Sequence, residues 1–294
     1  MHMYDTYASH LTNFIWLSSP VRLFADDAIT YLAIKNQQDT QQLQDDLHKI
    51  SEWASNWMME LNTQKCEVIR VSRKRNVANQ IYTLNNSVLR VTAASKYLGV
   101  TITSDLKWNQ HISNICRKAN TTLAFLRRNL RINLTELKAT AYKVLVRPLV
   151  EYCSSIWDPS TNRLIHQIEM IQRRAARFVL NRYHNTSSVT SMLEELGWPT
   201  LQKRREDSRL VLMYKLHHNL VSFPVEDFIT PLTGSTRTRS QQQGNGYQLP
   251  HCRTEHHRQS FFPRTIKAWN ALPPSKINAS SPKAFRLRLA EGQS

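Results

Sequence analysis

The chain has 294 residues, of which 41% are hydrophobic, so it can bury the cores of two modest domains and is not a chain disordered throughout. Lys and Arg number 39 against 22 Asp and Glu, which gives a formal net charge of +17 and a pI of about 10.0. This balance favours a polyanionic partner, above all nucleic acid. The charge is uneven, since residues 1–62 carry a net −5 and residues 63–294 a net +22.

The sequence shows no secretory signal and no membrane span. No apolar run reaches the roughly 18 residues of a transmembrane helix, and no basic-apolar-small leader opens the chain. The four cysteines are far apart and form no C-x-x-C pair of the kind that binds zinc. We therefore expect an intracellular protein that is not secreted and has no membrane partner.

Two adjacent carboxylates, Asp26 and Asp27, separate two short runs of apolar, β-favouring residues. These runs, within residues 20–34, predict a tight β-hairpin with both aspartates at its turn. Neighbouring like charges repel each other unless cations neutralise them, and Mg²⁺ prefers carboxylate oxygens. The pattern indicates either a Mg²⁺ site or a turn whose carboxylates are simply solvated.

The following segments predict one helix and several short strands. From Asp39 to Leu61 apolar residues recur three or four apart, as in an amphipathic helix, and Asp39 with Gln42 resembles a capping box. Asn85 and Asn86 can adopt the positive φ that a hairpin turn needs. Strands are predicted over residues 65–71, 81–84, 88–91 and 96–103. The N-terminal hundred residues are therefore predicted to be α+β.

After Trp108 the apolar spacing becomes helical. Pro148 is expected to end the second of the predicted helices. Residues 231–259 are polar and glycine-containing, so we interpret them as a mobile linker, and a short helix after it should return to the helical core. The main helices are predicted over residues 112–126, 134–146, 164–178 and 200–220.

Rows of basic residues lie on the predicted helices. Such rows can contact nucleic-acid phosphates without reading base sequence, although charged residues also simply solvate the outer faces of helices. The net charge of the segment favours binding. The rows are Arg127, Arg128 and Arg131; Arg173, Arg174 and Arg177; and Lys203, Arg204, Arg205 and Arg209.

Several blocks, in order along the chain, resemble the reverse transcriptase of jockey-like non-LTR retrotransposons. The palm hairpin with the paired aspartates is similar to V-R-L-F-A-D-D-A at residues 21–28. The helix and strand that follow it are similar to W-A-S-N-W-M-M-E-L-N-T-Q-K-C-E-V-I at 53–69, and the primer-grip hairpin is similar to K-Y-L-G-V-T-I-T at 96–103. Blocks that resemble the thumb and trailing region lie at residues 147–159, 172–178 and 260–273.

This resemblance implies an RNA-directed DNA polymerase that uses Mg²⁺, with an RNA template and a DNA primer as partners and no small-molecule cofactor. It implies that Asp26 and Asp27 are catalytic metal ligands and that Lys65 is the general acid for the departing pyrophosphate. Read alone, Lys65 is an ordinary lysine at the start of a strand. The residues implied to hold the primer's 3′ end are Tyr97, Leu98 and Gly99.

The resemblance also implies the order of the domains. Residues 1–104 correspond to a partial palm, a small antiparallel sheet plus a helix, and residues 105–230 to a helical, basic thumb-like body. Residues 231–259 are the polar linker. Residues 260–294 form a C-terminal helical segment.

The sequence also departs from the family pattern. In this family an earlier strand supplies another metal-binding aspartate, yet only 25 residues precede Asp26, and Asp5 has neither the spacing nor a strand-like setting. We therefore expect a polymerase fragment that does not polymerise alone. The alternatives are a non-enzymatic nucleic-acid-binding module and a decayed remnant of an element. The oligomeric state stays open.

Overall fold

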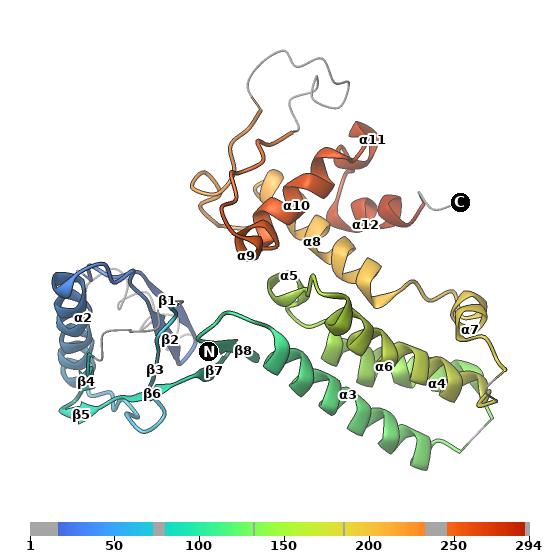
Figure 1. The fold of residues 1–294 in the computed structure, drawn as a ribbon, viewed down its shortest axis with the longest axis horizontal. Coiled ribbons are helices and arrows are strands. Elements are labelled where there is room, and N and C mark those ends of the chain that lie inside the picture. Colours follow the sequence, from blue (N-terminus) through green and yellow to red (C-terminus); the bar gives the residue numbers. More distant parts are fainter. Residues whose placement is uncertain (1–16, 73–79, 132, 185, 233–245, 292–294) are drawn as a thin grey trace. The chain divides into compact units, whose positions relative to one another are not determined.

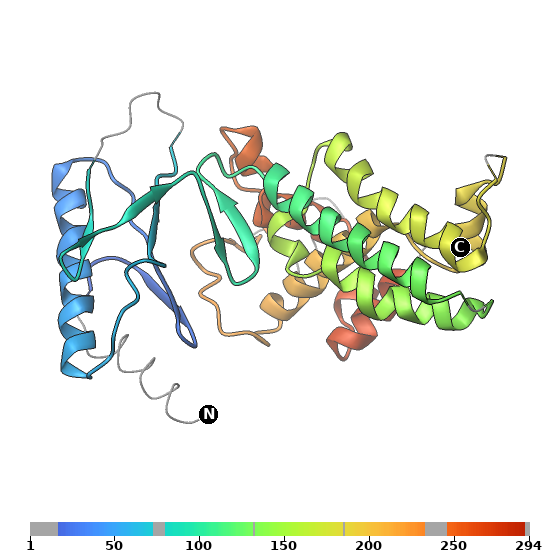
Figure 2. The same ribbon diagram turned by 90° about the horizontal axis from the view of Figure 1, so that it is seen from below.

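The chain divides into two compact units, Met1–His111 and Ile112–Ser294, which are described separately. The computed structural model describes residues 17–72, 80–131, 133–184, 186–232 and 246–291. Asp5 and residues 233–245 of the expected linker lie outside this part of the chain. Short strands and one long helix make up the described part of the first unit, whereas the second is mainly helical (Figures 1 and 2). The predicted α+β class is confirmed.

The strands of the first unit form separate two-stranded pairs. They are β1 (Val21–Phe24), β2 (Asp27–Thr30), β3 (Glu67–Ile69), β4 (Thr83–Leu84), β5 (Ser87–Val88), β6 (Arg90–Thr92), β7 (Ala94–Tyr97) and β8 (Val100–Thr103). The pairs β1–β2, β4–β5 and β7–β8 are antiparallel, whereas β3 and β6 are parallel. The single small antiparallel sheet expected from the sequence is therefore replaced, in the described residues, by four pairs.

Helix α2 (Gln37–Asn56) begins with a capping box. The Asn36 side chain accepts a hydrogen bond from the Asp39 amide at 3.0 Å, and the Asp39 carboxylate accepts from the amides of Lys35 and Asn36 at 2.6 and 3.0 Å. These bonds lower the pKa of Asp39. The predicted box of Asp39 and Gln42 was wrong, because Asp39 is the third residue of the helix and not its cap. The helix also ends before Leu61, and Met58 follows it with a φ of 53°.

Side chains of α2 form hydrogen bonds with the backbone of neighbouring segments. The buried Asp46 carboxylate accepts hydrogen bonds from the amides of Ser18 and Ser19 at 3.1 and 2.7 Å, just before β1. Burial acts to raise the pKa of Asp46, but hydrogen bonds from Ser19 and Ser18 and the charge of Lys49 outweigh it, so the pKa is lowered.

A second pair of hydrogen bonds joins α2 to β4. The Gln44 amide both donates to the Thr83 carbonyl and accepts from the Thr83 amide, at 2.9 Å each. A small apolar core lies beside this contact, and Leu43 and Leu47 of α2 pack against it. The buried members of that core are Tyr82, Leu84 and Leu89.

The second unit consists of helices around two apolar regions. The helices are α3 (Asn109–Asn129), α4 (Thr135–Ala141), η1 (Tyr142–Val146), η2 (Arg147–Val150), α5 (Ser154–Trp157), α6 (Asn162–Leu180), α7 (Val189–Glu195), α8 (Leu201–His217), α9 (Glu255–Arg258), α10 (Phe261–Asn270), α11 (Pro274–Ile277) and α12 (Pro282–Ala290). Helices α3, α4 and α6 lie side by side (Figures 1 and 2). Ile112 and Ala119 of α3 and Ile168, Ile171 and Ala175 of α6 are completely buried.

The helix that was predicted to end before Pro148 does not end there but changes its hydrogen-bonding pattern. It continues from α4 into the π-helical turn η1 and then into the 3₁₀ turn η2, which contains Pro148. Proline lacks the amide that the next α-helical hydrogen bond would need, and wider or tighter turns are a common way to accommodate such a break.

A second apolar cluster joins α8, α10 and α12, and the expected linker contributes to it. Tyr247 is buried in this cluster, and its hydroxyl lies 2.6 Å from Nδ1 of His217. Its backbone amide donates to the side-chain oxygen of Asn270 at 3.1 Å, and its carbonyl accepts from the side-chain nitrogen of Asn270 at 2.7 Å. The polar composition of residues 231–259 gave no sign that part of the segment belongs to the core.

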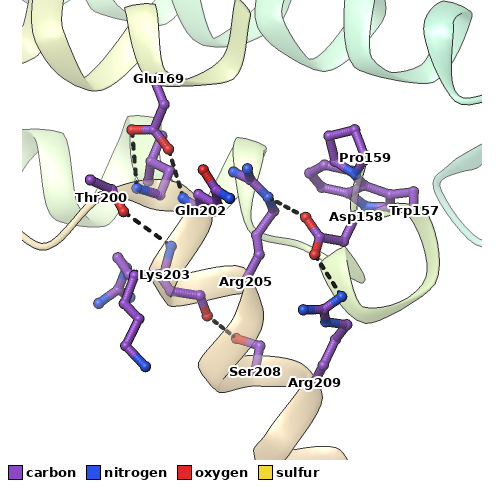
Figure 3. Close-up of polar contacts among 12 residues, drawn as sticks. Trp157, Asp158, Pro159, Glu169, Thr200, Gln202, Lys203, Arg205, Ser208 and Arg209 are labelled. Atoms are coloured by element: carbon purple, nitrogen blue, oxygen red, sulfur yellow. Dashed lines mark hydrogen bonds and ion pairs between the residues drawn. The ribbon is translucent and has the colours of Figure 1, made fainter. Parts of the chain in front are cut away.

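One buried carboxylate, Asp158, ties α8 and α10 to the end of α5. Figure 3 shows its contacts with Arg205 and Arg209 of α8. Its Oδ1 accepts a hydrogen bond from Nε of Arg205 at 2.7 Å, and its Oδ2 lies 3.1 Å from Nη1 of Arg209 and 3.3 Å from Nη2 of Arg264. Arg264 also donates to the Asp158 backbone carbonyl at 3.0 Å. Burial lowers the pKa of Arg209, and the charge of Asp158 opposes that shift.

These contacts correct the interpretation of the third basic row. Arg205 and Arg209 are buried and form ion pairs inside the unit. The other two members of the row are also engaged, Lys203 with Asp207 at 2.6 Å and Arg204 with Glu151. Arg205 and Arg209 are therefore structural ion-pair partners that cannot face phosphates, and Lys203 and Arg204 are partly neutralised by their acidic partners.

Replacing Asp158 should destabilise the second unit strongly. In Asp158→Asn three guanidinium groups lose their shared counter-charge, and breaking a buried ion pair on one side costs about 3–5 kcal/mol. Asp207→Asn is the matched control, because its pair with Lys203 is partly exposed and should contribute less than about 1 kcal/mol. Urea unfolding of the whole chain measures both changes. Equal losses would contradict the role given to Asp158.

Candidate functional site

The hairpin β1–β2 presents the paired aspartates at its tip. Phe24 pairs with Asp27, so the two-residue turn consists of Ala25 and Asp26, and Asp27 is the first residue of β2. The prediction that both aspartates form the turn was wrong by one residue. Ala25 has a φ of 52°, which is a left-handed backbone conformation. For a residue with a side chain this conformation costs roughly 1–2 kcal/mol of conformational free energy. Both carboxylates are exposed.

The hairpin β7–β8 carries Tyr97, which lies within range of the Asp27 charge on the hairpin β1–β2. Tyr97 ends β7, and Leu98 and Gly99 form the turn, with φ values of 44° and 85°. Positive φ at both central residues is typical of the tight turns that match strand twist. Partial burial raises the pKa of Tyr97, and the negative charge of Asp27 raises it further. Asp27 and Tyr97 are thus close enough to interact electrostatically, although 69 residues separate them in the sequence.

Lys65 lies in a turn and not in a strand. Its backbone amide donates to the carbonyl of Asn62 at 3.0 Å and to the side-chain oxygen of Asn62 at 3.3 Å, and β3 begins two residues later. The Lys65 side chain is exposed, and among the described residues it forms no ion pair or hydrogen bond with Asp26 or Asp27. Among the described residues, Tyr97 therefore lies within range of the Asp27 charge, whereas Lys65 makes no direct ion pair with either aspartate.

The carboxylates present do not make up a complete metal centre. Within the described ranges, no group of three or more His, Cys, Asp or Glu side chains is arranged to hold a metal ion. Two-metal phosphoryl transfer needs carboxylates from separate strands to hold both ions. Asp26 and Asp27 come from one hairpin, so the described residues do not fit that chemistry by themselves.

Helices α3 and α6 carry the basic surface. Helix α3 contains no acidic residue, and its cations are Arg117, Lys118, Arg127 and Arg128. Helix α6 contains one acidic residue, Glu169, whose oxygens accept from the amides of Leu201 and Gln202 at 3.1 and 2.6 Å and so cap α8. The cations of α6 are Arg163, Arg173, Arg174 and Arg177.

Contacts across these helices define which predicted arginines share a surface. Nη1 of Arg174 donates to the Asn120 side chain of α3 at 2.9 Å, and Cζ of Arg127 lies 5.3 Å from the ring centre of Tyr183, just after α6. Arg128 is exposed, whereas Arg173 and Arg177 are half-buried. Arg177 donates to the His184 carbonyl at 3.4 Å.

Sequence reasoning missed Arg117 and Lys118 as members of the basic surface. They are not clustered with other arginines, so no row was apparent. A detectable signal was the lack of any acidic side chain in the whole of α3. The proximity of Tyr97 to Asp27 had no such signal, because it depends on how two hairpins pack.

In the part of the chain that the structure describes, no helix is both long enough and apolar enough to span a bilayer.

Comparison with known proteins shows similarity to polymerases of mobile elements. The chain is 28% identical over 166 residues to "Probable RNA-directed DNA polymerase from transposon X-element" of Drosophila melanogaster. The aligned region covers 55% of this chain and 18% of that protein. The chain is 25% identical over 164 residues to "RNA-directed DNA polymerase from mobile element jockey" of the same species, covering 53% and 18%. A third relative, "Probable RNA-directed DNA polymerase from transposon BS", is 23% identical over 209 residues, covering 68% and 23%.

These similarities confirm the predicted resemblance to jockey-like non-LTR retrotransposon polymerases. The matched region amounts to about a fifth of the length of these relatives. No protein-family model and no solved structure matches the chain.

The position of Tyr97 can be checked through its ionisation. Because the Asp27 charge disfavours the tyrosinate, Asp27→Asn should lower the pKa of Tyr97. Asp26→Asn removes the same charge from the adjacent turn position and should have a smaller effect. NMR titration of the selectively labelled Tyr97 ring measures both shifts. Equal shifts in the two variants, or none, would contradict the arrangement of the hairpins.

Proposed function

We propose that this chain is a segment of the RNA-directed DNA polymerase of a jockey-like mobile element. The observation that carries this proposal is the similarity of about half of the chain to such polymerases, and the action of the Asp27 charge on Tyr97 of the second hairpin agrees with it. A paired-aspartate hairpin next to a second tight hairpin suits a site where a primer terminus meets a metal-bound nucleotide. On this proposal residues 1–104 are part of the palm, 105–230 the thumb, 231–259 a connecting segment and 260–294 a trailing helical segment.

The residues have the following proposed roles. Asp26 and Asp27 contribute oxygen ligands to Mg²⁺, together with a carboxylate that the described residues do not supply. Tyr97, Leu98 and Gly99 contact the primer's 3′ end, and the backbone of Gly99 leaves room for close approach. The role of Lys65 as general acid rests on the family resemblance alone, since the described contacts of Lys65 are made by its backbone amide and its side chain is exposed.

Nucleic acid is the proposed partner of the second unit, as RNA template and DNA primer. Arg127, Arg128, Arg173, Arg174 and Arg177 would contact backbone phosphates, which requires positive charge but no reading of bases. The proposed location is intracellular, in the nucleus or in a cytoplasmic ribonucleoprotein.

A second candidate is a nucleic-acid-binding module without catalysis. It is favoured by the contrast between the two units, because α3 and α6 offer eight cations against one carboxylate while the metal ligands are incomplete. Both candidates share binding and differ in whether the aspartates matter.

We expect no primer extension by the purified chain. With RNA template, DNA primer, deoxynucleotides and Mg²⁺, the incomplete carboxylate set should leave product at the level of Asp26→Asn and Asp27→Asn, as read on a denaturing gel. Extension by the unaltered chain that disappears in either variant would show that the described carboxylates suffice. It would overturn the proposed inactivity and exclude the non-catalytic candidate.

Binding of an RNA–DNA duplex should be strong at low salt and weaken steeply as salt rises. Each phosphate neutralised contributes about −0.9 to the slope of log K against log salt concentration. Fluorescence anisotropy of a labelled duplex between 50 and 200 mM salt measures the slope. Asp26→Asn should leave it unchanged. Absence of binding, or binding that salt does not weaken, would contradict the proposed function.

A further inference from the structure

A solvent-accessible hollow of about 510 Å³ lies between α3 and α6. None of the residues that line it carries a carboxylate, and two of them are arginines, Arg117 of α3 and Arg174 of α6. Their guanidinium groups are exposed. The neutral polar groups of the lining are Ser113, Asn120, Thr121 and Gln167.

The contacts around the hollow hold one of the arginines in place. Asn120 accepts a hydrogen bond from Nη1 of Arg174, so the guanidinium is held against α3, and among the described residues this is the one hydrogen bond that its five N–H donors make. Arg117 lies one helical turn before Asn120 on the same side of α3. A guanidinium fork fixed in this way suits the two oxygens of a phosphate.

The remaining charge around the hollow is also positive. Cys116 lines the hollow, and burial raises its pKa to about 11, which keeps the thiol neutral at physiological pH. Arg205 and Arg174 oppose that shift, so both lie near enough for their charges to act there. No negative group competes with a ligand for Arg117 and Arg174 among the described ion pairs.

The same side of α3 continues beyond the hollow to Arg127 and Arg128. At 1.5 Å per residue, the distance along α3 from Arg117 to Arg128 is about 16 Å. One strand of a duplex rises by about 3.4 Å per nucleotide, so this length corresponds to roughly five nucleotides. No aromatic ring lines the hollow, which argues against a stacked base and for backbone.

We infer that this hollow binds backbone phosphates of a nucleic-acid strand through the guanidinium groups of Arg117 and Arg174. The strand would run along α3 towards Arg127 and Arg128. The inference rests on the proposed function and adds a specific phosphate site to it. The contacts are to backbone, so the site does not select base sequence.

The test compares the double variant Arg117→Ala/Arg174→Ala with the control Lys283→Ala/Arg286→Ala in the whole chain. The control removes the same charge from exposed positions of α12. With the labelled RNA–DNA duplex, the first variant should bind roughly tenfold more weakly at 50 mM salt and lose about two from the salt slope. The control should change both values much less. Circular dichroism melting curves verify that both variants fold.

The outcomes separate this inference from the proposed function. Equal weakening in both variants overturns the site while duplex binding by the unaltered chain still supports the proposed function. Absence of binding by the unaltered chain overturns both. Displacement of the duplex by deoxynucleoside triphosphate or inorganic phosphate at the same phosphate concentration would show a site for a small phosphate ligand and would also overturn the inference.

Discussion

The second unit depends on the contact of one carboxylate with three arginines. Asp158 faces Arg205, Arg209 and Arg264, which come from α8 and α10, so one side chain links parts of the chain that are far apart in sequence. A buried charge is tolerated only with partners, and here three cations share one anion. The excess positive charge inside the unit makes the carboxylate more important than an ordinary surface pair.

This buried network divides the basic residues of the unit into two groups. Arginines of α8 and α10 hold the fold together through Asp158, whereas those of α3 and α6 are exposed or half-buried, and Glu169 is the one acidic residue of these two helices. Charge composition alone cannot distinguish the groups. The net charge therefore overstates the surface available to nucleic acid, and the arginines of the α3–α6 surface contribute disproportionately to any binding.

Strong local patterns predicted most of the elements. The periodicity of α3 and α6 and the Asn85–Asn86 turn, where both residues have positive φ, appear where the sequence placed them. Predictions were wrong where neighbouring residues are equally suited to the same structural position. Asn36 and Asp39 are both good cap residues, and only the geometry shows which one caps α2. Burial of Arg205 and of Tyr247 depends on partners distant in the chain, which no local pattern reveals.

The candidate site shows the same division between what is local and what is not. The paired aspartates are a local feature that the sequence located to within one residue, whereas residues 96–103 were predicted as one strand and are interrupted by the Leu98–Gly99 turn. The action of the Asp27 charge on Tyr97 depends on how the two hairpins pack, and the described residues do not supply the remaining metal ligand. A carboxylate pair on one hairpin can attract a cation, but two ions held for phosphoryl transfer need ligands that converge from separate strands. Convergence, and not the presence of the motif, therefore decides whether this hairpin does chemistry or only lies beside bound nucleic acid.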